Sequence, residues 1–388
     1  MVIKQINLYD PNTNQVVSTI DIGANGENVT ITDSSGRISS TNINGALAEI
    51  LALIGSGGGT AISDIAGLQT VLDNKQDKLS AGNNIIISPE GVISVASGLG
   101  YSVPKMKNNP LPAGKGELRI LSIGNSHTRY PSKYVPYIVN AAGIDKTKLC
   151  WYILYQGSSS LEYWAGIYEG GTNRALEDTN VGTLSISRTS GTMAELLSQD
   201  WDVITLQQVS TNLYDYNTFE PYLTTLINAI KRHCPKAAIA WQFGWQDSDY
   251  FNPNGGIINY SNKFNSIIDA VKKVVALNGI DIIIPSGMAI ENARFTSLNI
   301  DNYNLTEDTN HLAAGVGKYI GAGTWFQTLI APVFNKSFYG DTTKQSDYGE
   351  TSTNHLNPVT ESNRTLCQEC VMAAVADMWN ITQVEQSS

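Results

Sequence analysis

The stretch Glu117–Thr128, ELRILSIGNSHT, decides how the rest of the chain is interpreted. Its first half is a continuous apolar run, the kind of segment that lies inside a parallel β-sheet with both faces covered. The run ends at Gly124, and Ser126 follows on a turn that begins with this glycine. A serine in that position is presented at the carboxyl edge of the sheet, where its backbone N–H and its hydroxyl face the same space.

Further apolar runs follow downstream, and segments with helical spacing separate them. The predicted strands are 148–157, 200–208, 236–245 and 279–287, and the predicted helices are 132–143, 219–234, 264–279 and 313–330. Strands that alternate with helices indicate βαβ units, so we expect an α/β domain whose parallel sheet has helices on both faces. In such a domain the working site lies beyond the carboxyl ends of the strands.

Polar residues with useful donors stand at two of these carboxyl ends. The second strand ends at Gly157, where the missing side chain lets a backbone N–H approach a ligand closely. The third strand ends in Gln207 and Gln208, which both carry side-chain amide donors. Adjacent strand residues face opposite ways, so one of the two glutamines serves the site, and we favour Gln207.

Asp308 and His311 stand three residues apart at the start of a predicted helix, so both side chains fit on one side of a turn. This spacing lets the carboxylate hold one imidazole nitrogen while the other nitrogen faces a hydroxyl. The chain has four histidines, and His127, His233 and His355 have no carboxylate at this spacing. His311 is therefore the candidate base.

These blocks, in this order over residues 117–330, resemble the SGNH (GDSL-like) hydrolase superfamily, closest to its GNSxT-type branch of gut Bacteroidetes. The resemblance implies a flavodoxin-like parallel sheet sandwiched by helices, the SGNH hydrolase fold. It makes Ser126 the nucleophile, His311 the base that takes its proton, and Asp308 the carboxylate that orients the histidine. It also implies an oxyanion hole built from the N–H groups of Ser126 and Gly157 and a side-chain amide.

Two departures from the family pattern bear on activity. Asn125 stands where the nucleophile block of most members has aspartate, which removes a carboxylate outside the triad. The Gly-x-Asn-Asp block is absent, so Gln207 or Gln208 must supply the third donor. Glutamine is one methylene longer than asparagine, which requires a slightly retracted backbone. Serine, histidine and amide donors suffice for acyl transfer, so we expect neither a metal nor a cofactor.

Aromatic residues near the strand ends suggest contacts with sugar rings. Of the two tryptophans in the run 236–245, Trp241 is expected in the core and Trp245 against the substrate. Tyr163, near Gly157, is expected to contact the substrate as well, and Asn125 completes the predicted substrate contacts.

The first hundred residues differ from the rest. Residues 1–38 alternate apolar and polar positions between turn-rich breaks, which predicts short antiparallel strands. Residues 42–54 and 65–79 have helical spacing, and residues 83–95 predict a hairpin with Gly91 in its turn.

Segments between residues 40 and 97, among them TNINGALAEI and ISDIAGLQTVLDNKQDKLSAGNNIII, resemble recurrent segments of phage tail-fibre and tail-spike proteins. The resemblance implies a slender homotrimeric shaft whose N-terminus attaches to other phage tail proteins. We therefore expect a β-rich attachment segment over residues 1–38, a trimerising fibre segment with helices and a hairpin over 39–100, and an SGNH-like esterase domain over 101–388.

Composition narrows the range of partners. Lys and Arg number 25 against 35 Asp and Glu, a net charge of −10, which argues against a nucleic-acid protein with clustered basic residues. No apolar stretch approaches the roughly 20 residues that cross a bilayer, and the start of the chain has no apolar core of a signal peptide. Cys367 and Cys370 are expected to be buried structural thiols in a helix, with a redox pair or half a zinc site as the alternatives.

The sequence thus predicts a phage tail fibre or spike-type virion protein, made in the host cytoplasm, that acts at the bacterial surface. Its C-terminal domain is predicted to remove O-acetyl groups from bacterial surface polysaccharide. Two alternatives stay open: a glycan-binding receptor-recognition module that uses the same cleft without turnover, and a purely structural fibre tip.

The fibre-like segment generates a prediction about assembly. Two turns of heptad-like spacing are too short to stand alone as a helix, so they need copies of themselves. Light scattering of the intact protein should give about three times the chain mass of 42.0 kDa. Removal of residues 1–100 should give a monomer. A monomeric full-length protein would refute the shaft.

Overall fold

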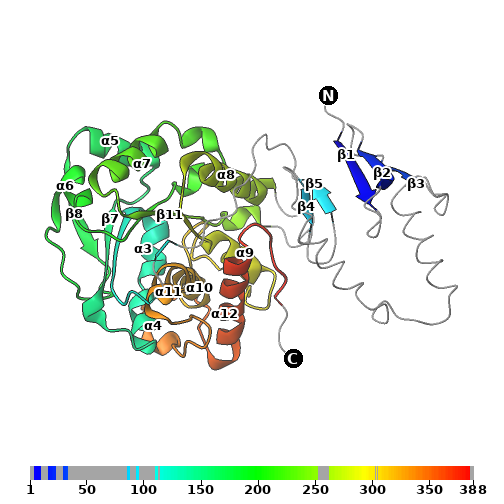
Figure 1. Cartoon of the computed structure of the whole chain (residues 1–388). Coiled ribbons are helices and arrows are strands. Elements are labelled where there is room, and N and C mark those ends of the chain that lie inside the picture. Colours follow the sequence, from blue (N-terminus) through cyan, green and yellow to red (C-terminus); the bar gives the residue numbers. More distant parts are fainter. Residues whose placement is uncertain are drawn as a thin grey trace. The chain divides into compact units, whose positions relative to one another are not determined.

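The apolar runs predicted as parallel strands lie side by side in one sheet of the computed structural model (Figure 1). They form β6 (Leu118–Gly124), β7 (Leu149–Tyr155), β10 (Val203–Leu206), β11 (Ala238–Gln242) and β12 (Ile282–Ile284). Each pairs in parallel with its neighbour. Nearly every residue in these strands is buried, which explains why the sequence is apolar without interruption there.

Two further strands extend the sheet beyond β7. They are β8 (Asn173–Asp178), which pairs antiparallel with β7, and β9 (Ser190–Thr192), which pairs antiparallel with β8. Their side chains are polar and half exposed, so they lack the apolar pattern that marks a central strand. The domain is a mixed α/β fold with a seven-stranded, mostly parallel sheet in the order β12-β11-β10-β6-β7-β8-β9.

The strand order reverses beside β6. The chain passes from β6 to β7 on one side and later crosses to β10 on the other side. Such a reversal leaves a crevice beyond the carboxyl ends of the two central strands. Ser126 follows β6 and Gln207 follows β10, so both flank this crevice.

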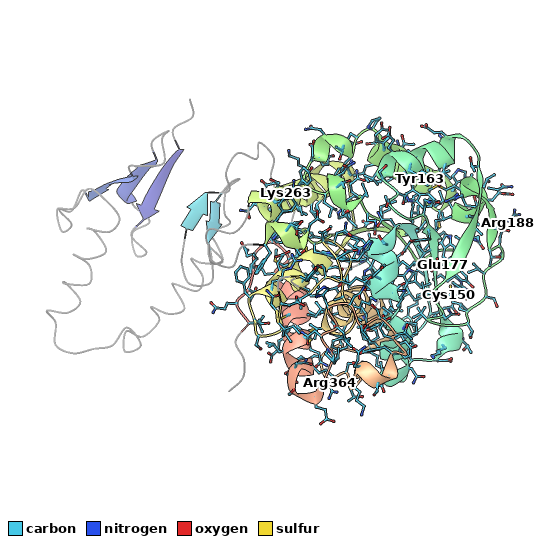
Figure 2. All side chains as sticks on the ribbon, turned by 180° about the vertical axis from the view of Figure 1, so that it is seen from behind. Cys150, Tyr163, Glu177, Arg188, Lys263 and Arg364 are labelled. Atoms are coloured by element: carbon cyan, nitrogen blue, oxygen red, sulfur yellow. The ribbon has the colours of Figure 1, made fainter. Side chains whose placement is uncertain are left out.

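Helices form two groups that cover the sheet (Figure 1). One group contains α5 (Leu161–Glu169), α6 (Met193–Leu197), α7 (Tyr222–His233) and α8 (Asn262–Asn278). The other contains α3 (Ser126–Ser132), α4 (Val135–Ala141), α9 (Ser286–Arg294), α10 (Val316–Trp325), the π-helical turn Phe326–Ile330, α11 (Ala331–Phe334) and α12 (Glu361–Ala376). In Figure 2, which views the molecule from behind, Lys263 marks α8 in the first group and Arg364 marks α12 in the second.

The C-terminal helix α12 packs against α9 and α10 within its helix group. It begins at Glu361, after a cap at Thr360. Cys367 and Cys370 are buried free thiols on this helix, which confirms the prediction of buried thiols.

The contact between Trp151 and Trp325 ties α10 to the sheet. The two indole rings are fully buried and stack with centroids 4.7 Å apart. Trp151 Nε1 also donates a hydrogen bond of 2.8 Å to Ser122 Oγ in β6. At Gly321, α10 approaches α3 so closely that a Cβ would lie 3.2 Å from Pro131 Cγ. Helix α10, which follows the His311 segment, is thereby fixed relative to β6 and α3.

The chain divides into two compact units, residues 1–98 and 99–388. The structure describes residues 110–111, 114–251, 262–301, 303 and 305–384, together with the backbone of five strands before residue 98. Strands β1 (Lys4–Tyr9), β2 (Val16–Ile22) and β3 (Val29–Asp33) form an antiparallel sheet, and β4 (Ile85–Ile87) pairs antiparallel with β5 (Ile93–Val95). The helices expected at 42–54 and 65–79 lie outside the described residues.

Among the described residues, no helix combines the length and the apolar character needed to cross a membrane.

Candidate active site

Asn125 shapes the turn that presents Ser126. It is the N-cap of α3: its Oδ1 accepts the N–H of His127 at 2.9 Å, and its Nδ2 donates to the carbonyl of Ser159 at 2.9 Å. The side chain is only 1% exposed. The prediction that Asn125 contacts substrate is therefore wrong, because its amide is committed to the turn and to the end of the neighbouring loop. Ser126, the first residue of the helix, stays partly exposed.

Because Gly124 has no side chain, α3 packs closely against the end of the sheet. A Cβ at this position would lie 2.6 Å from Thr128 Oγ1 and 3.1 Å from Gln207 Cδ. Any larger residue would have to push the helix away from the end of β10. The glycine therefore keeps the first turn of α3 beside Gln207.

The structure brings Ser126, His311 and Asp308 together in one chain of hydrogen bonds. His311 Nε2 lies 2.8 Å from Ser126 Oγ, and His311 Nδ1 lies 2.7 Å from Asp308 Oδ2. The predicted proximity of the hydroxyl and the imidazole is confirmed, although 185 positions separate them in the sequence. With Nδ1 bonded to a carboxylate, Nε2 is the nitrogen left to accept the hydroxyl proton.

Asp308 is held by the backbone as well as by the imidazole. Its Oδ1 accepts the N–H of Asn310 at 2.8 Å and that of His311 at 2.7 Å. Partial burial raises the pKa of Asp308, but the hydrogen bonds from His311 and Asn310 outweigh it and bring the pKa below its usual value. Asp308, whose side chain is 52% exposed, is therefore ionised at neutral pH.

Tyr130, which was not predicted as a site residue, supports the imidazole from α3. Its ring stacks on His311 with centroids 4.8 Å apart. Tyr130 stands four residues after Ser126, so both share one face of the helix. That spacing is the signal in the sequence from which this role can be predicted. Burial and a hydrogen bond to Glu307 raise the pKa of Tyr130, so the phenol stays neutral.

His127 lies beneath the site and is 3% exposed. Its ring stacks on Trp245 at 4.3 Å and meets His311 edge-on at 6.4 Å. Burial, and then the charge of His311, lower the pKa of His127 to about 3, so it is neutral at physiological pH. It is a packing neighbour of the triad.

Trp245 is fully buried, so the prediction that it stacks on a sugar ring is wrong. Strand alternation does not separate Trp241 from Trp245, because residues four apart on a strand share a face, and Trp245 lies in the loop after β11, which ends at Gln242. One face of Trp245 is covered by His127, and its Nε1 donates to the carbonyl of Asn310 at 2.7 Å. Trp245 thus helps to hold the His311 segment. Trp241 lies in the core, as predicted.

Gln207 and Gln208 differ in what their amides are bonded to. Gln208 accepts the N–H of Leu161 at 3.1 Å and donates to the carbonyl of Thr218 at 3.2 Å. Gln207 accepts from Thr128 Oγ1, and its Nε2 is buried with no hydrogen-bond partner among the described residues. Gln207 is therefore the glutamine with an uncommitted donor next to the first turn of α3.

Gly157 and Tyr163 lie on the far side of the crevice. The pairing of β6 with β7 ends at Gly124 and Tyr155, and Gly157 follows in an exposed turn. A Cβ at Gly157 would meet only the Tyr155 hydroxyl, at 3.5 Å. Tyr163 is half-buried on α5, with its hydroxyl 3.5 Å from Gln156 Oε1. Its place beside the Gly157 turn is compatible with the predicted contact to substrate.

The two remaining histidines have other partners. His355 Nδ1 lies 3.0 Å from Asp301 Oδ2, and its ring stacks on Tyr303. His233, at the end of α7, lies 3.1 Å from the hydroxyl of Tyr168. Within the described part of the chain, no three His, Cys, Asp or Glu residues gather as a metal site.

The fold and the site together define an α/β domain with a Ser-His-Asp arrangement at the carboxyl ends of its central strands. Residues 119–354 match the family model described as "Domain of unknown function (DUF4886)", and the chain belongs to this family. No curated protein matches the chain.

The solved structures that match this chain include the following two. A DUF4886 family protein from Bacteroides uniformis is 24% identical, with a TM-score of 0.54 over 69% of this chain and 98% of that one, and shares the fold. The salicylyl-acyltransferase SsfX3 from a tetracycline biosynthetic pathway is 16% identical, with a TM-score of 0.33 over 56% of each chain.

The buried His127 generates a prediction about acid stability. Its folded pKa of about 3 lies below its ordinary value of 6.5, so between these values the unfolded chain binds a proton that the folded chain does not. This contribution to stability is complete above pH 6.5 and is lost as the pH falls toward 3. From pH 7 to pH 4.5, wild type should lose about 2–3 kcal/mol more unfolding free energy than His127→Phe, which keeps the stack on Trp245.

Urea denaturation of both proteins at the two pH values measures this difference. Taking the difference between the two proteins cancels other groups that titrate in the same range, such as Glu291, whose pKa burial raises to about 7. An identical loss in both proteins would contradict the prediction.

Proposed function

We propose that this protein is a serine esterase of the SGNH (GDSL-like) type that removes O-acetyl groups from bacterial surface polysaccharide. The observation that carries the proposal is the hydrogen-bonded chain from Ser126 Oγ through His311 to Asp308. A serine with a base in hydrogen-bond reach, and a base with an orienting carboxylate, is the arrangement that activates a hydroxyl nucleophile.

The reaction follows from this arrangement in two halves. Ser126 Oγ attacks the acetyl carbonyl while its proton passes to His311 Nε2. The tetrahedral intermediate collapses, the sugar oxygen leaves with the proton from His311, and the acetyl group stays on Ser126. Water then attacks the acyl-enzyme with His311 as base, which releases acetate and restores the serine. Asp308 stays ionised throughout and stabilises the imidazolium.

The negative oxygen of each tetrahedral intermediate needs donors that are in place beforehand. The backbone N–H groups of Ser126 and Gly157 are two candidates, since both lie at the carboxyl edge of the sheet. The third is Gln207 Nε2, whose lack of a partner among the described residues supports this role. The Gln208 amide is already bonded to Leu161 and Thr218.

The arrangement of the sheet also supports the SGNH relationship. Numbered along the chain, the five parallel strands have the order 2-1-3-4-5, which is the flavodoxin-like order. This order brings the ends of β6, β7 and β10 next to one another. Because such folds host many activities, the esterase assignment rests on the side chains at those ends.

The polysaccharide substrate and the phage setting rest on the sequence. Residues 40–97 resemble phage fibre segments, and the low fraction of charged residues, 15%, suits a protein that contacts sugars. In this proposal the protein is a virion component that meets the bacterial surface. The alternative is a glycan-binding module without turnover. Such a module does not require a hydrogen bond between Ser126 and His311, and we therefore favour the enzyme.

The triad generates the first test of activity. Ser126→Ala and His311→Ala should each lower kcat on p-nitrophenyl acetate by at least about 10³-fold, since each removes a member of one catalytic unit. Asp308→Asn should also lower kcat strongly, because it favours the wrong imidazole tautomer. The matched control is His355→Ala, which removes a histidine that is also paired with an aspartate, Asp301, but is not a member of the triad.

Equal hydrolysis by wild type and the triad variants would refute the esterase. Binding of an acetylated polysaccharide without release of acetate would favour the binding module.

The two glutamines generate a second test. Gln207→Ala should lower kcat on p-nitrophenyl acetate by about 10²–10³-fold with little change in KM, the usual effect of losing one oxyanion donor. Gln208→Ala, the matched variant, should mainly lower the urea midpoint, because it leaves the Leu161 N–H without its acceptor. A larger loss of kcat in Gln208→Ala than in Gln207→Ala would reverse the assignment.

A further inference from the structure

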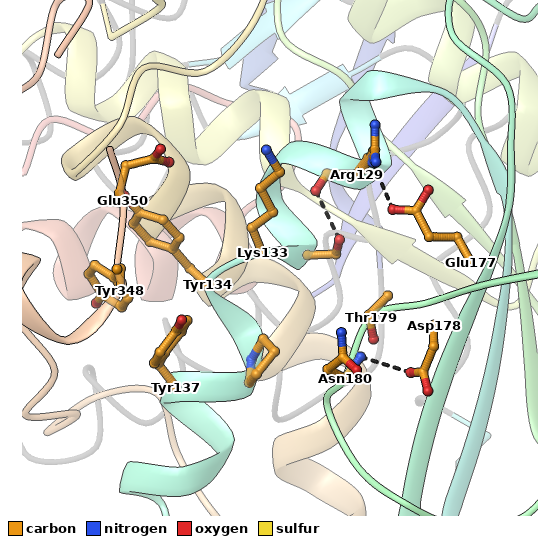
Figure 3. Close-up of a pocket in the computed structure, with 13 residues that line it drawn as sticks. Arg129, Lys133, Tyr134, Tyr137, Glu177, Asp178, Thr179, Asn180, Tyr348 and Glu350 are labelled. Carbon is orange, nitrogen blue, oxygen red and sulfur yellow. Dashed lines mark hydrogen bonds and ion pairs between the residues drawn. The ribbon is translucent and has the colours of Figure 1, made fainter. Parts of the chain in front are cut away.

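A polar pocket of about 400 Å³ lies along α3, beyond the triad (Figure 3). Its walls are the second half of α3, the start of α4, the end of β8 with the residues that follow it, and the segment 348–350. In Figure 3, Lys133 and Arg129 border one end, Glu177 and Asn180 lie on one side, and Tyr137 lies on the other. The catalytic steps above use none of these side chains.

The pocket continues from the triad along one face of α3. Ser126, Arg129, Tyr130 and Lys133 are spaced three, four and seven residues apart, so they share that face. Lys133 Nζ lies 5.1 Å from the centroid of the Tyr130 ring, which itself stacks on His311. With a rise of about 1.5 Å per residue, Lys133 is about 10 Å along the helix from Ser126.

Arg129, which lines the pocket, connects it through Tyr155 to the turn at Gly157. The Arg129 guanidinium lies 4.5 Å from the centroid of the Tyr155 ring, and the Tyr155 hydroxyl lies next to Gly157. An ester at Ser126 therefore has one direction that runs along α3 into the pocket. It passes between Tyr130, which stacks on His311, and Tyr155, which contacts Arg129.

Charges of both signs alternate around the pocket. Arg129 is paired with Glu177 at 2.7 Å, and Glu350 with Lys318 at 2.7 Å. Lys133 forms no ion pair with the described residues. A strongly charged ligand would meet a like charge here, whereas sugar hydroxyls can donate to the carboxylates and accept from the cations.

An exposed tyrosine adds a surface for stacking. Tyr137 is 36% exposed and is held edge-on against Tyr348, with ring centroids 5.5 Å apart. Tyr348 in turn stacks on the buried Tyr134 at 3.8 Å. The ring of Tyr137 is therefore fixed in place at the edge of the pocket, which suits contact with the apolar face of a sugar ring.

We propose that this pocket is the subsite that binds the sugar residues next to the acetylated one, and that its ligand is an uncharged saccharide chain. This inference rests on the proposed esterase function, because it requires an ester at Ser126. It assigns Tyr137 and Lys133 as residues that determine which polymer is deacetylated.

The test compares a small ester with a polymeric one. The substrates are p-nitrophenyl acetate and partially O-acetylated dextran, and the readout is the ratio of kcat/KM for dextran to that for the small ester. This ratio should fall at least ten-fold in Tyr137→Ala and at least three-fold in Lys133→Gln, mainly through KM for the polymer. The matched control, Tyr339→Ala, removes a tyrosine that is 52% exposed outside the pocket and should leave the ratio unchanged.

The possible failures are distinguishable. Absence of p-nitrophenyl acetate hydrolysis by wild type would overturn the esterase itself. Hydrolysis of both substrates with an unchanged ratio in both variants would overturn the subsite alone. A wild-type preference for partially O-acetylated polygalacturonate over acetylated dextran would overturn the uncharged ligand. If Tyr137→Ala does not fold, as judged by circular dichroism, Lys133→Gln gives the same decision through the loss of the ammonium group.

Discussion

The hydrogen bond between Ser126 and His311 is the constraint that the site depends on, because it joins two segments 185 positions apart. A bond of this length is kept only if both segments are fixed by the fold. Ser126 is fixed because Gly124 lets α3 sit on the sheet, and Asn125 caps that helix. His311 is fixed because the next helix, α10, is packed on the sheet through Trp325 and Trp151.

The segment that carries His311 is itself held from a third direction. The loop after β11 bonds to it twice: Trp245 Nε1 donates to the carbonyl of Asn310, and the N–H of Ser248 donates to the carbonyl of Thr309 at 2.7 Å. These bonds satisfy backbone carbonyls that flank the imidazole. Asp308 is largely exposed, so its orientation depends on such local bonds more than on burial. The segment that carries His311 is therefore positioned by hydrogen bonds from the loop that follows β11.

The sequence predicted what depends on burial and on chain order. The parallel strands are apolar throughout, so the sequence predicted them. Ser126 and His311 were expected at the same edge of the sheet because the working site of such a fold lies beyond the carboxyl ends of its strands. The sequence did not predict β8, whose polar residues lack strand periodicity, or the burial of Trp245, which depends on where β11 ends. It also left open which glutamine is available, because that depends on Thr128 and Leu161, partners from other elements.

In the proposed esterase, the short helix that bears Ser126 also sets the distance to a ligand bound in the pocket beyond it. Ser126 begins α3, and Lys133 is its C-cap, so the helix is a rigid spacer between the ester and the pocket. A rigid spacing allows the binding of neighbouring sugars to hold the acetyl group at the nucleophile, and this positioning lowers the barrier to the reaction. A small ester that lacks those sugars loses this contribution while it still meets the same triad. In this proposal, selectivity for a polymer and chemistry at the ester come from the two ends of one helix.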